Sequence, residues 1–450
     1  MGNALITRRG GGGADINGIV YKYKAKTDEG TLMNASEFVD YETIIDLLHS
    51  ESSFPVLNSG TTSYGEPFVF QLNDSTYIWG NTGGGYYKPS MRVMTVDESG
   101  SVTFGTTTSI SFADAASSSG YMSNIVRIDD STFAFVHTGT NDYPKLYVVS
   151  VSGTTLTILH HYTVSSNMSY SFNNIALKYF GDGILLVTGV DKNSPSKTLD
   201  FWFSFNGSKL TLLSSSSGVA CSISHFNLQY DVDDTHVIRV NTSGEVQLIS
   251  FIPSSQLKTE GTIIKVASSG YIGYGSIQLR AHENVLKNFN KDSGEMVIVI
   301  ISRSYNSGYP TQAILSVNLN TYNITLIDIG KDSTNLIGYG VKFSEEDFMN
   351  LYTGYSNPVL SIFHYVPTRM TYRIKNVTTG IKTSSPTSSG IISENKAWLY
   401  WYGALAGASL NTHNLAIVSM GAKKPESSTF GVTKTSAYNG EDIEVYQPNI

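Results

Sequence analysis

Pairs of neighbouring carboxylates are the residues of this sequence whose types and spacing come closest to a chemical site. The pairs are Asp129-Asp130, Asp233-Asp234 and Glu345-Glu346. Two carboxylates side by side suit a hard cation such as Ca²⁺, or the acid and base of glycoside hydrolysis. Each pair lies, however, in a short polar turn before an apolar run. Asp is favoured in such turns because its side chain bonds the backbone two residues further on. We therefore interpret these pairs as structural turns.

Other chemical signatures are absent from the sequence. The nine histidines are scattered, and the adjacent residues His160 and His161 would point to opposite faces of a strand. HExxH, GxSxG, the P-loop and the sialidase Asp/Gly/Trp repeat are all missing. Cys221 is the single cysteine, and Gly83-Gly84-Gly85 is not followed by a helix that would bind a phosphate. The sequence therefore predicts a non-enzymatic protein with no catalytic residue, metal ligand or cofactor.

The turns that hold the carboxylates recur along the chain, and each is followed by an apolar strand pattern. Their acidic residues are Asp74, Asp130, Asp182, Asp234, Asp292, Glu346 and Glu394. The spacings are 56, 52, 52, 58, 54 and 48 residues. A unit of this length accommodates four strands joined by hairpins, which is the blade of a β-propeller. The fold class is therefore all-β: one closed β-propeller of about seven four-stranded blades. Six or eight blades remain open because blade boundaries are soft.

Two units can be divided into strands A to D. The predicted strands are 68–72, 76–80, 91–96 and 101–104 in the first unit, and 124–128, 132–138, 145–151 and 155–159 in the second. The loop between strands B and C contains a proline in five units, namely Pro89, Pro144, Pro195, Pro310 and Pro358. Proline is excluded from central strands, so its recurrence indicates the same loop each time.

The two ends of the chain lie outside the repeat. Residues 1–60 are predicted to be a tether or attachment segment, with four glycines at Gly10–Gly13, a strand at Gly18–Lys24 and a helix at 36–50. Residues 61–435 form the propeller, and 436–450 form a C-terminal strand and tail. The alternating stretch at 441–446 is expected either to complete the last blade or to pair with another chain.

Tyrosines in the B–C loops are the candidate ligand-binding residues. They are Tyr86, Tyr87, Tyr143, Tyr305, Tyr309 and Tyr355. Tyrosine offers a rigid apolar face and a hydroxyl at low entropic cost, which suits sugar or protein surfaces. The alternative is that these rings only cover hairpin tips. Trp79, Trp202, Trp398 and Trp401 lie inside strand patterns and are expected to pack in the core.

Composition restricts the class of partner and the cellular setting. The net charge of -7 argues against nucleic acid. No apolar run is long enough for membrane insertion, and no signal-peptide core follows Met1. Only 15% of residues are charged, as in extracellular β proteins. A particle that is assembled in a host cytoplasm and later released, such as a virion, reconciles these observations.

The terminal sequences MGNALITRRGGGGA and GVTKTSAYNGEDIEVYQPNI resemble those of tail-fibre and baseplate-associated proteins of phages that infect Gram-positive bacteria. The resemblance implies a bacteriophage virion structural protein of the tail-fibre or receptor-binding type, often a homo-oligomer (trimer). Its implied partners are other virion proteins, through the N-terminal segment, and host surface polysaccharide or protein, through the propeller loops. The alternatives are a polysaccharide depolymerase or glycosidase on a propeller, and a non-adhesive scaffold or decoration protein.

Overall fold

The computed structural model describes part of the chain, and all of the described elements are strands. The described residues are 7–8, 18–24, 41–51, 67–81, 90–97, 101–106, 108–109, 120–139, 143–168, 175–220, 226–241, 245–265, 287–290, 294–303, 310–331, 337–342, 347–353, 359–364, 372–378, 381–383, 388–393, 396–405, 412–422, 432–433 and 442–448. In this part of the chain no helix is long and apolar enough to cross a membrane.

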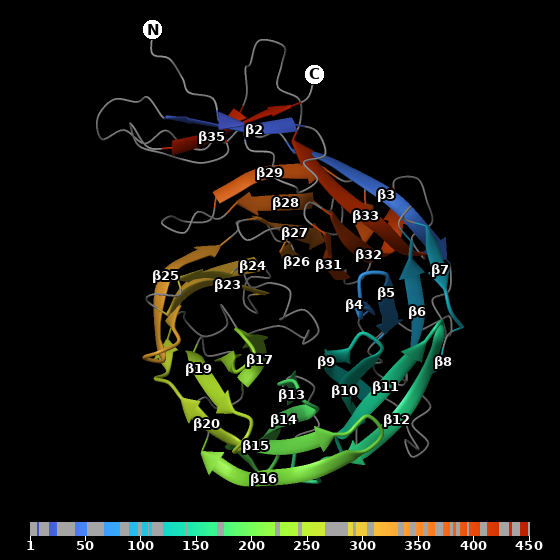
Figure 1. The fold of residues 1–450 in the computed structure, drawn as a ribbon, viewed down its shortest axis with the longest axis vertical. Coiled ribbons are helices and arrows are strands. Elements are labelled where there is room, and N and C mark those ends of the chain that lie inside the picture. Colours follow the sequence, from blue (N-terminus) through green and yellow to red (C-terminus); the bar gives the residue numbers. More distant parts are fainter. Residues whose placement is uncertain are drawn as a thin grey trace.

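Seven antiparallel sheets follow one another around a ring, and each is one blade of a β-propeller (Figure 1). Blade 1 contains β4 (Pro67–Gln71), β5 (Thr76–Asn81), β6 (Ser90–Val96), β7 (Val102–Phe104) and β8 (Thr108–Ser109). Blade 2 contains β9 (Gly120–Asp129), β10 (Thr132–Gly139), β11 (Lys145–Ser152) and β12 (Thr155–Thr163). Blade 3 contains β13 (Ile175–Tyr179), β14 (Ile184–Asp191), β15 (Ser194–Phe205) and β16 (Leu210–Ala220). The first strand of each blade lies nearest the ring centre.

The remaining blades repeat this order. Blade 4 contains β17 (Phe226–Asp231), β18 (His236–Asn241), β19 (Glu245–Ile252), β20 (Leu257–Glu260) and β21 (Ile264–Lys265). Blade 5 contains β22 (Lys287–Asn290), β23 (Glu295–Arg303), β24 (Pro310–Asn318) and β25 (Asn323–Lys331). Blade 6 contains β26 (Ile337–Lys342), β27 (Asp347–Thr353), β28 (Val359–His364) and β29 (Tyr372–Thr378). Blade 7 contains β30 (Ile381–Thr383), β31 (Ser388–Ser393), β32 (Lys396–Leu405), β33 (Thr412–Ala422) and β3 (Tyr41–Glu51). The sheet count confirms the predicted fold and the count of seven blades.

The ring is closed by β3, which precedes blade 1 in the chain but is the outermost strand of blade 7. Its partner is β33, from Tyr41 opposite Ala422 to Glu51 opposite His413. The helix predicted over 36–50 is therefore wrong for these residues. The helical spacing of apolar residues is overridden by pairing with a distant strand, which satisfies the backbone of both elements. This part of the predicted 1–60 tether belongs to the ring.

The terminal segments form an eighth sheet outside the ring. Its strands are β1 (Thr7–Arg8), β2 (Gly18–Lys24), β35 (Asp442–Pro448) and β34 (Val432–Thr433), in that order. The central pair is antiparallel, with Gly18 opposite Pro448. The strand expected at 441–446 is present as β35. It neither completes the last blade nor is left for another chain, because β2 pairs with it.

The strands predicted for blade 1 agree with the observed strands within one residue at either end, whereas in blade 2 the first strand, β9, begins four residues before the predicted 124–128 and the last, β12, ends four residues after the predicted 155–159. The predicted strand 132–138 is β10, and 145–151 is β11, each within one residue at either end. Of the B–C prolines, Pro144 directly precedes β11, whereas Pro195 and Pro310 are within the first two residues of β15 and β24. Pro89 and Pro358 lie outside the described residues. Proline at the start of a strand leaves the interior ladder intact.

Neighbouring blades pack through apolar side chains. One core joins blades 1 and 2 around Phe133 and Phe135, and another joins blades 2 and 3 around Phe203. Leu415 of blade 7 packs in the cluster that contains Trp79 of blade 1, so the closing contact has an apolar core as well. Trp79 and Trp202 are buried, as expected for core residues. Trp398 and Trp401 lie in β32, and their side chains are outside the described set.

Candidate functional site

The A–B turns, which join the first and second strands of a blade, are locked by their own side chains. Asn73 Oδ1 accepts hydrogen bonds from the backbone N–H groups of Ser75 and Thr76 at 3.1 and 2.9 Å. Asp129 Oδ1 accepts one from the N–H of Ser131 at 2.8 Å. This is the structural role inferred for the carboxylate pairs. In the two pairs that the structure describes, Asp129-Asp130 and Asp233-Asp234, it is the first residue that makes these bonds, and Glu345-Glu346 lies outside the described residues.

Blade 4 has the most elaborate A–B turn. Asp233 Oδ1 accepts hydrogen bonds from the N–H groups of Thr235 and His236, and its carboxylate lies 2.8 Å from His236 Nδ1. Burial of the Asp233 carboxylate opposes its ionisation. The hydrogen bonds from His236 and Thr235 outweigh burial and hold the pKa of Asp233 far below its usual range. The His236 ring also lies 6.3 Å from that of Tyr322, whose backbone φ is 59°. The turn is thus tied to blade 5.

A buried polar network connects blades 3 and 4. Lys258 Nζ of β20 lies 2.9 Å from Asp200 Oδ2 of β15 and 3.0 Å from Glu260 Oε1. Thr188 donates to Asp200 Oδ1 at 2.8 Å, and Arg239 donates to Thr188 Oγ1 at 3.3 Å. Burial raises the pKa of Asp200, but the charges of Arg239 and Lys258 outweigh this effect and lower it below its ordinary value. The carboxylates and cations of this network therefore compensate one another, and we interpret the network as a structural contact between the two blades.

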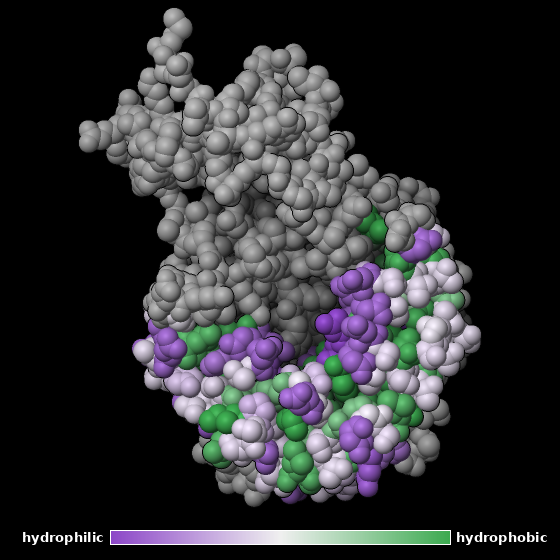
Figure 2. Space-filling model, viewed as in Figure 1, coloured by the Kyte–Doolittle hydropathy of each residue, from purple (hydrophilic) through white to green (hydrophobic). Residues whose placement is uncertain are grey.

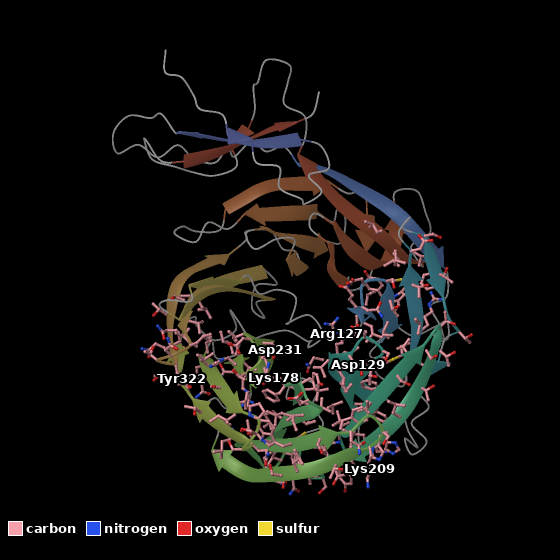
Figure 3. The ribbon with its side chains drawn as sticks, in the orientation of Figure 1. Arg127, Asp129, Lys178, Lys209, Asp231 and Tyr322 are labelled. Atoms are coloured by element: carbon pink, nitrogen blue, oxygen red, sulfur yellow. The ribbon has the colours of Figure 1, made fainter. Side chains whose placement is uncertain are left out.

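Polar side chains also lie along the inner strands. Figure 2 shows a hollow at the centre of the ring, with hydrophilic residues along the described part of its rim. Arg127, Lys178 and Asp231 lie at this inner edge (Figure 3). Lys178 Nζ is 3.3 Å from Asp231 Oδ1 and donates to the Asp233 carbonyl at 2.8 Å, and Arg127 donates to the Leu72 carbonyl at 3.3 Å. These bonds join neighbouring blades, so the described charges at the rim are engaged in holding the ring together.

The opposite ends of the strands carry the B–C connections and the connections between consecutive blades, and we call this side the B–C face. Met168, after blade 2, bridges to Asp191 at the end of β14, and the N–H of Lys192 donates to the Asn167 carbonyl at 2.9 Å. Tyr143, in the B–C connection of blade 2, is 51% exposed, and its ring centroid lies 6.0 Å from Lys192 Nζ. Of the Phe, Tyr and Trp side chains that the structure describes, Tyr143 is the one that is exposed.

The B–C face of blades 2 and 3 is therefore the candidate binding site. Tyr143 is exposed on this face, and its ligand-binding role stays a prediction. The other candidates, Tyr86, Tyr87, Tyr305, Tyr309 and Tyr355, lie outside the described residues. Lys192 and Asn167 were not singled out from the sequence. Lys192 lies three residues before the B–C proline of blade 3, and this repeat position is the signal that would have found it.

The other features considered for chemistry are the adjacent histidines, possible metal ligands, the glycine run and the cysteine. His160 pairs with Val148 and His161 with Tyr147, and these two partners pack in different cores, so the two rings lie on opposite faces as predicted. Among the described residues no group of three or more His, Cys, Asp or Glu is placed to hold a metal ion. Gly83-Gly84-Gly85 and Cys221 lie outside the described part of the chain.

Comparison with known proteins gives likeness of fold. No family model and no curated protein matches the sequence. A putative 6-phosphogluconolactonase from Bacteroides fragilis is similar with a TM-score of 0.48 and 11% identity, covering 77% of this chain and 97% of the other. The periplasmic gluconolactonase PpgL of Pseudomonas aeruginosa has a TM-score of 0.48 and 10% identity, with 75% and 96% covered. The WD40 domain of SCAP from fission yeast has a TM-score of 0.45 and 9% identity, with 84% and 98% covered.

These neighbours correct one expectation. The sequence predicted a non-enzymatic protein because familiar catalytic motifs are missing. Solved structures named as lactonases now stand among the proteins similar to this chain, which contradicts that prediction. Function is carried by a site placed on a fold, so the absence of familiar sequence motifs does not exclude catalysis. The likeness at this identity concerns the fold, and the substrates of these neighbours are not transferred.

Proposed function

We propose that this chain is a phage virion protein of the tail-fibre or receptor-binding type, which binds host surface glycan or protein through the B–C face. The observation that carries the proposal is the division of the molecule into two parts. The terminal segments pair with each other in a sheet outside the ring, through β2 and β35 (Figure 1). β1, β34 and β35 lie within the two terminal sequences that resemble phage tail and baseplate proteins, and β2 follows the N-terminal one.

The two parts are suited to different tasks. A propeller leaves only short, protected sheet edges, so we expect attachment to a neighbour to use an additional element. The terminal sheet is such an element, and its outer strands, β1 and β34, are two residues long each. In the part of the chain that the structure describes, β1 pairs with two residues of β2 and β34 with two residues of β35, and the proposal places a strand of a virion partner beside the rest of the β2–β35 pair. The proposal therefore assigns the terminal sheet to virion partners, in a homo-oligomer such as a trimer.

The B–C face supports the binding role. The exposed ring of Tyr143 in blade 2 lies beside the Lys192 ammonium of blade 3. Exposed tyrosine next to polar groups is the composition of many recognition surfaces, because the ring contributes contact area with few rotatable bonds. The proposal concerns binding, and turnover of a bound glycan is compatible with it.

The test separates attachment from binding. Removing residues 1–24 together with 432–450 deletes the terminal sheet but keeps β3, so the ring should retain its cooperative unfolding. We expect this variant not to incorporate into particles, whereas Tyr143→Ala should incorporate normally and reduce adsorption to host cells.

A variant lacking residues 1–60 is the matched comparison, because it also removes β3. It should lose thermal stability in the purified protein, whereas the variant that keeps β3 should not. Normal incorporation without the terminal sheet would contradict the attachment role. Unchanged adsorption of Tyr143→Ala, measured on purified particles, would contradict the role of this part of the B–C face.

A further inference from the structure

Four polar or aromatic residues gather on the B–C face of blades 2 and 3. Tyr143 belongs to the B–C connection of blade 2, and Lys192 and Asn193 to that of blade 3. Asn167 belongs to the connection between the two blades. All four are exposed. The Tyr143 ring lies 6.0 Å from Lys192 Nζ, and the Asn167 carbonyl accepts the Lys192 N–H at 2.9 Å. Three connections that are separate in the sequence thus meet around one aromatic ring.

Tyr143 is held by a rigid backbone. Pro144 follows it, is buried, and its carbonyl accepts the N–H of Val164 at 2.8 Å. Proline fixes its own φ and restricts the residue before it to an extended conformation. The ring of Tyr143 is therefore presented from a fixed point, and little entropy is lost when a ligand packs on it.

Lys192 and Asn193 are held in a similar way. Asp191 Oδ1 accepts the N–H of Asn193 at 2.9 Å, which closes the turn. Met168 packs against Gly189, where an added Cβ would lie 2.4 Å from Met168 Cγ, so the connection is seated closely on β14. The Asn167 N–H donates to Ser165 Oγ at 3.1 Å. The described backbone of these two connections is therefore held by hydrogen bonds.

The charges on this surface favour an anion. None of the carboxylates that the structure describes forms an ion pair with Lys192, and the nearest in sequence, Asp191, is engaged with the Asn193 N–H. The buried lysines of the ring differ, because Lys178 and Lys258 each contact a carboxylate. The Lys192 ammonium is thus available to a carboxylate or phosphate from outside the molecule.

We propose that Tyr143, Lys192, Asn167 and Asn193 form a binding subsite for an anionic glycan. A sugar ring packs its C–H face on Tyr143, the two carboxamides bond its hydroxyls, and Lys192 pairs with a carboxylate or phosphate on the same or the next unit. The subsite rests on the proposed function for its biological role, since it would supply the receptor contact. Its chemistry depends only on the four side chains.

The test uses the full chain and three probes in calorimetric titrations. The probes are a galacturonic acid tetramer, its fully methyl-esterified form and a glycerol phosphate oligomer. We expect one or both of the charged probes to bind and the ester to bind at least about tenfold more weakly, because a charge-assisted bond is lost. The two charged probes distinguish carboxylate from phosphate as the preferred anion. The proposal is overturned if the ester binds as tightly as the tighter of the two charged probes, or if neither charged probe binds.

Variants assign the effect to the two side chains. Lys192→Gln should weaken the charged probes about tenfold and leave the ester unchanged, whereas Lys192→Arg should retain binding. Tyr143→Ala should weaken all probes, and Tyr143→Phe should not. Lys209→Gln is the matched control, because Lys209 is also exposed but lies in the turn at the other end of β15 (Figure 3). If Lys192→Gln and Lys209→Gln behave alike, the subsite is wrong.

Failure of this proposal is distinguishable from failure of the proposed function. Adsorption of particles to host cells that is unaffected by Lys192→Gln and Tyr143→Ala would contradict the receptor role of the subsite but leave a virion role, which the terminal-sheet deletion tests by itself. Glycan binding by a chain that does not enter particles would support the subsite and contradict the virion role.

Discussion

The contact between blades 3 and 4 and the B–C face of blades 2 and 3 both contain lysines among polar side chains, in opposite settings. Lys258 is largely buried between Asp200 and Glu260, at 2.9 and 3.0 Å. Lys192 is exposed and has an aromatic ring as its neighbour. A buried ammonium requires its carboxylate partners because an unpaired charge there is costly. An exposed one is stable in water and can exchange water for a ligand. The position of a lysine in its blade, rather than its residue type, therefore decides whether it stabilises the fold or is available to bind a ligand.

The largest expected effect comes from breaking the buried side of this comparison. Asp200→Ala removes the carboxylate that compensates the buried Arg239 and one of the two carboxylates that contact Lys258, so we expect a loss of about 3 kcal/mol in the free energy of unfolding. Urea denaturation monitored by tryptophan fluorescence measures it. Asp130→Ala is the control, since the Asp130 side chain is 85% exposed and lies 3.9 Å from Arg127. A loss no greater than that of the control would show that the network is not a structural contact.

A second buried group makes stability depend on pH. Burial, and then the nearby Lys145 ammonium, lower the pKa of His137 to about 3. Because the folded pKa is below the unfolded value of about 6.5, the neutral ring stabilises the fold above that value. This stability is lost as the pH falls from about 6.5 toward 3. The free energy of unfolding should fall by up to about 1.4 kcal/mol per pH unit in this window.

His137→Gln is the variant that isolates this effect, because it keeps a polar group but does not titrate. Its unfolding free energy, measured by urea titrations at half-unit steps, should depend less on pH between 4 and 6 than that of the parent. Parallel curves for the two proteins would contradict the assignment. His137 lies on β10 directly opposite Lys145 of β11, two residues from Tyr143. The titrating group is thus buried close to the exposed binding residue.

The sequence predicted the blades well for a physical reason. Turn chemistry and alternation are local, so the hairpins of blades 1 and 2 could be located from the residues within each unit. The ring closure could not, because Tyr41–Glu51 becomes a strand only through β33, which lies at the other end of the repeat. The candidate site divides in the same way. Tyr143 was predicted from its loop, whereas its neighbour Lys192 is brought close only by the packing of two blades.

An intermediate effect is expected at the A–B turn of blade 4. Asp233→Ala removes the acceptor of two backbone N–H groups and the partner of His236, so we expect a loss of about 1–2 kcal/mol in unfolding free energy near neutral pH. Asp233→Asn should lose less, because an amide oxygen supports the same turn in blade 1 through Asn73.

The ionised Asp233 also gives this turn a pH dependence of known sign. Its folded pKa lies below the unfolded value of about 3.9, so its stabilisation is present above that value and is lost as the pH falls below it. Thermal unfolding at pH 3 and pH 6 should therefore show a smaller difference between parent and Asp233→Asn at pH 3. A difference that grows toward pH 3 would reverse the sign and exclude this account.

The smallest effect on stability is expected where the largest effect on binding is proposed. Tyr143 and Lys192 are exposed and, of the described contacts, share only a ring–ammonium approach of 6.0 Å, so Tyr143→Ala and Lys192→Gln should each change the free energy of unfolding by less than about 0.5 kcal/mol. Urea titrations at neutral pH provide the value, and the glycan titrations on the same samples provide the affinity. If both variants lose as much stability as Asp200→Ala does, Tyr143 and Lys192 stabilise the fold, and the B–C face does not differ from the contact between blades 3 and 4. If stability is kept while affinity for the charged glycan falls, blade packing and recognition are carried by separate residues, and the B–C face can be changed without loss of the ring.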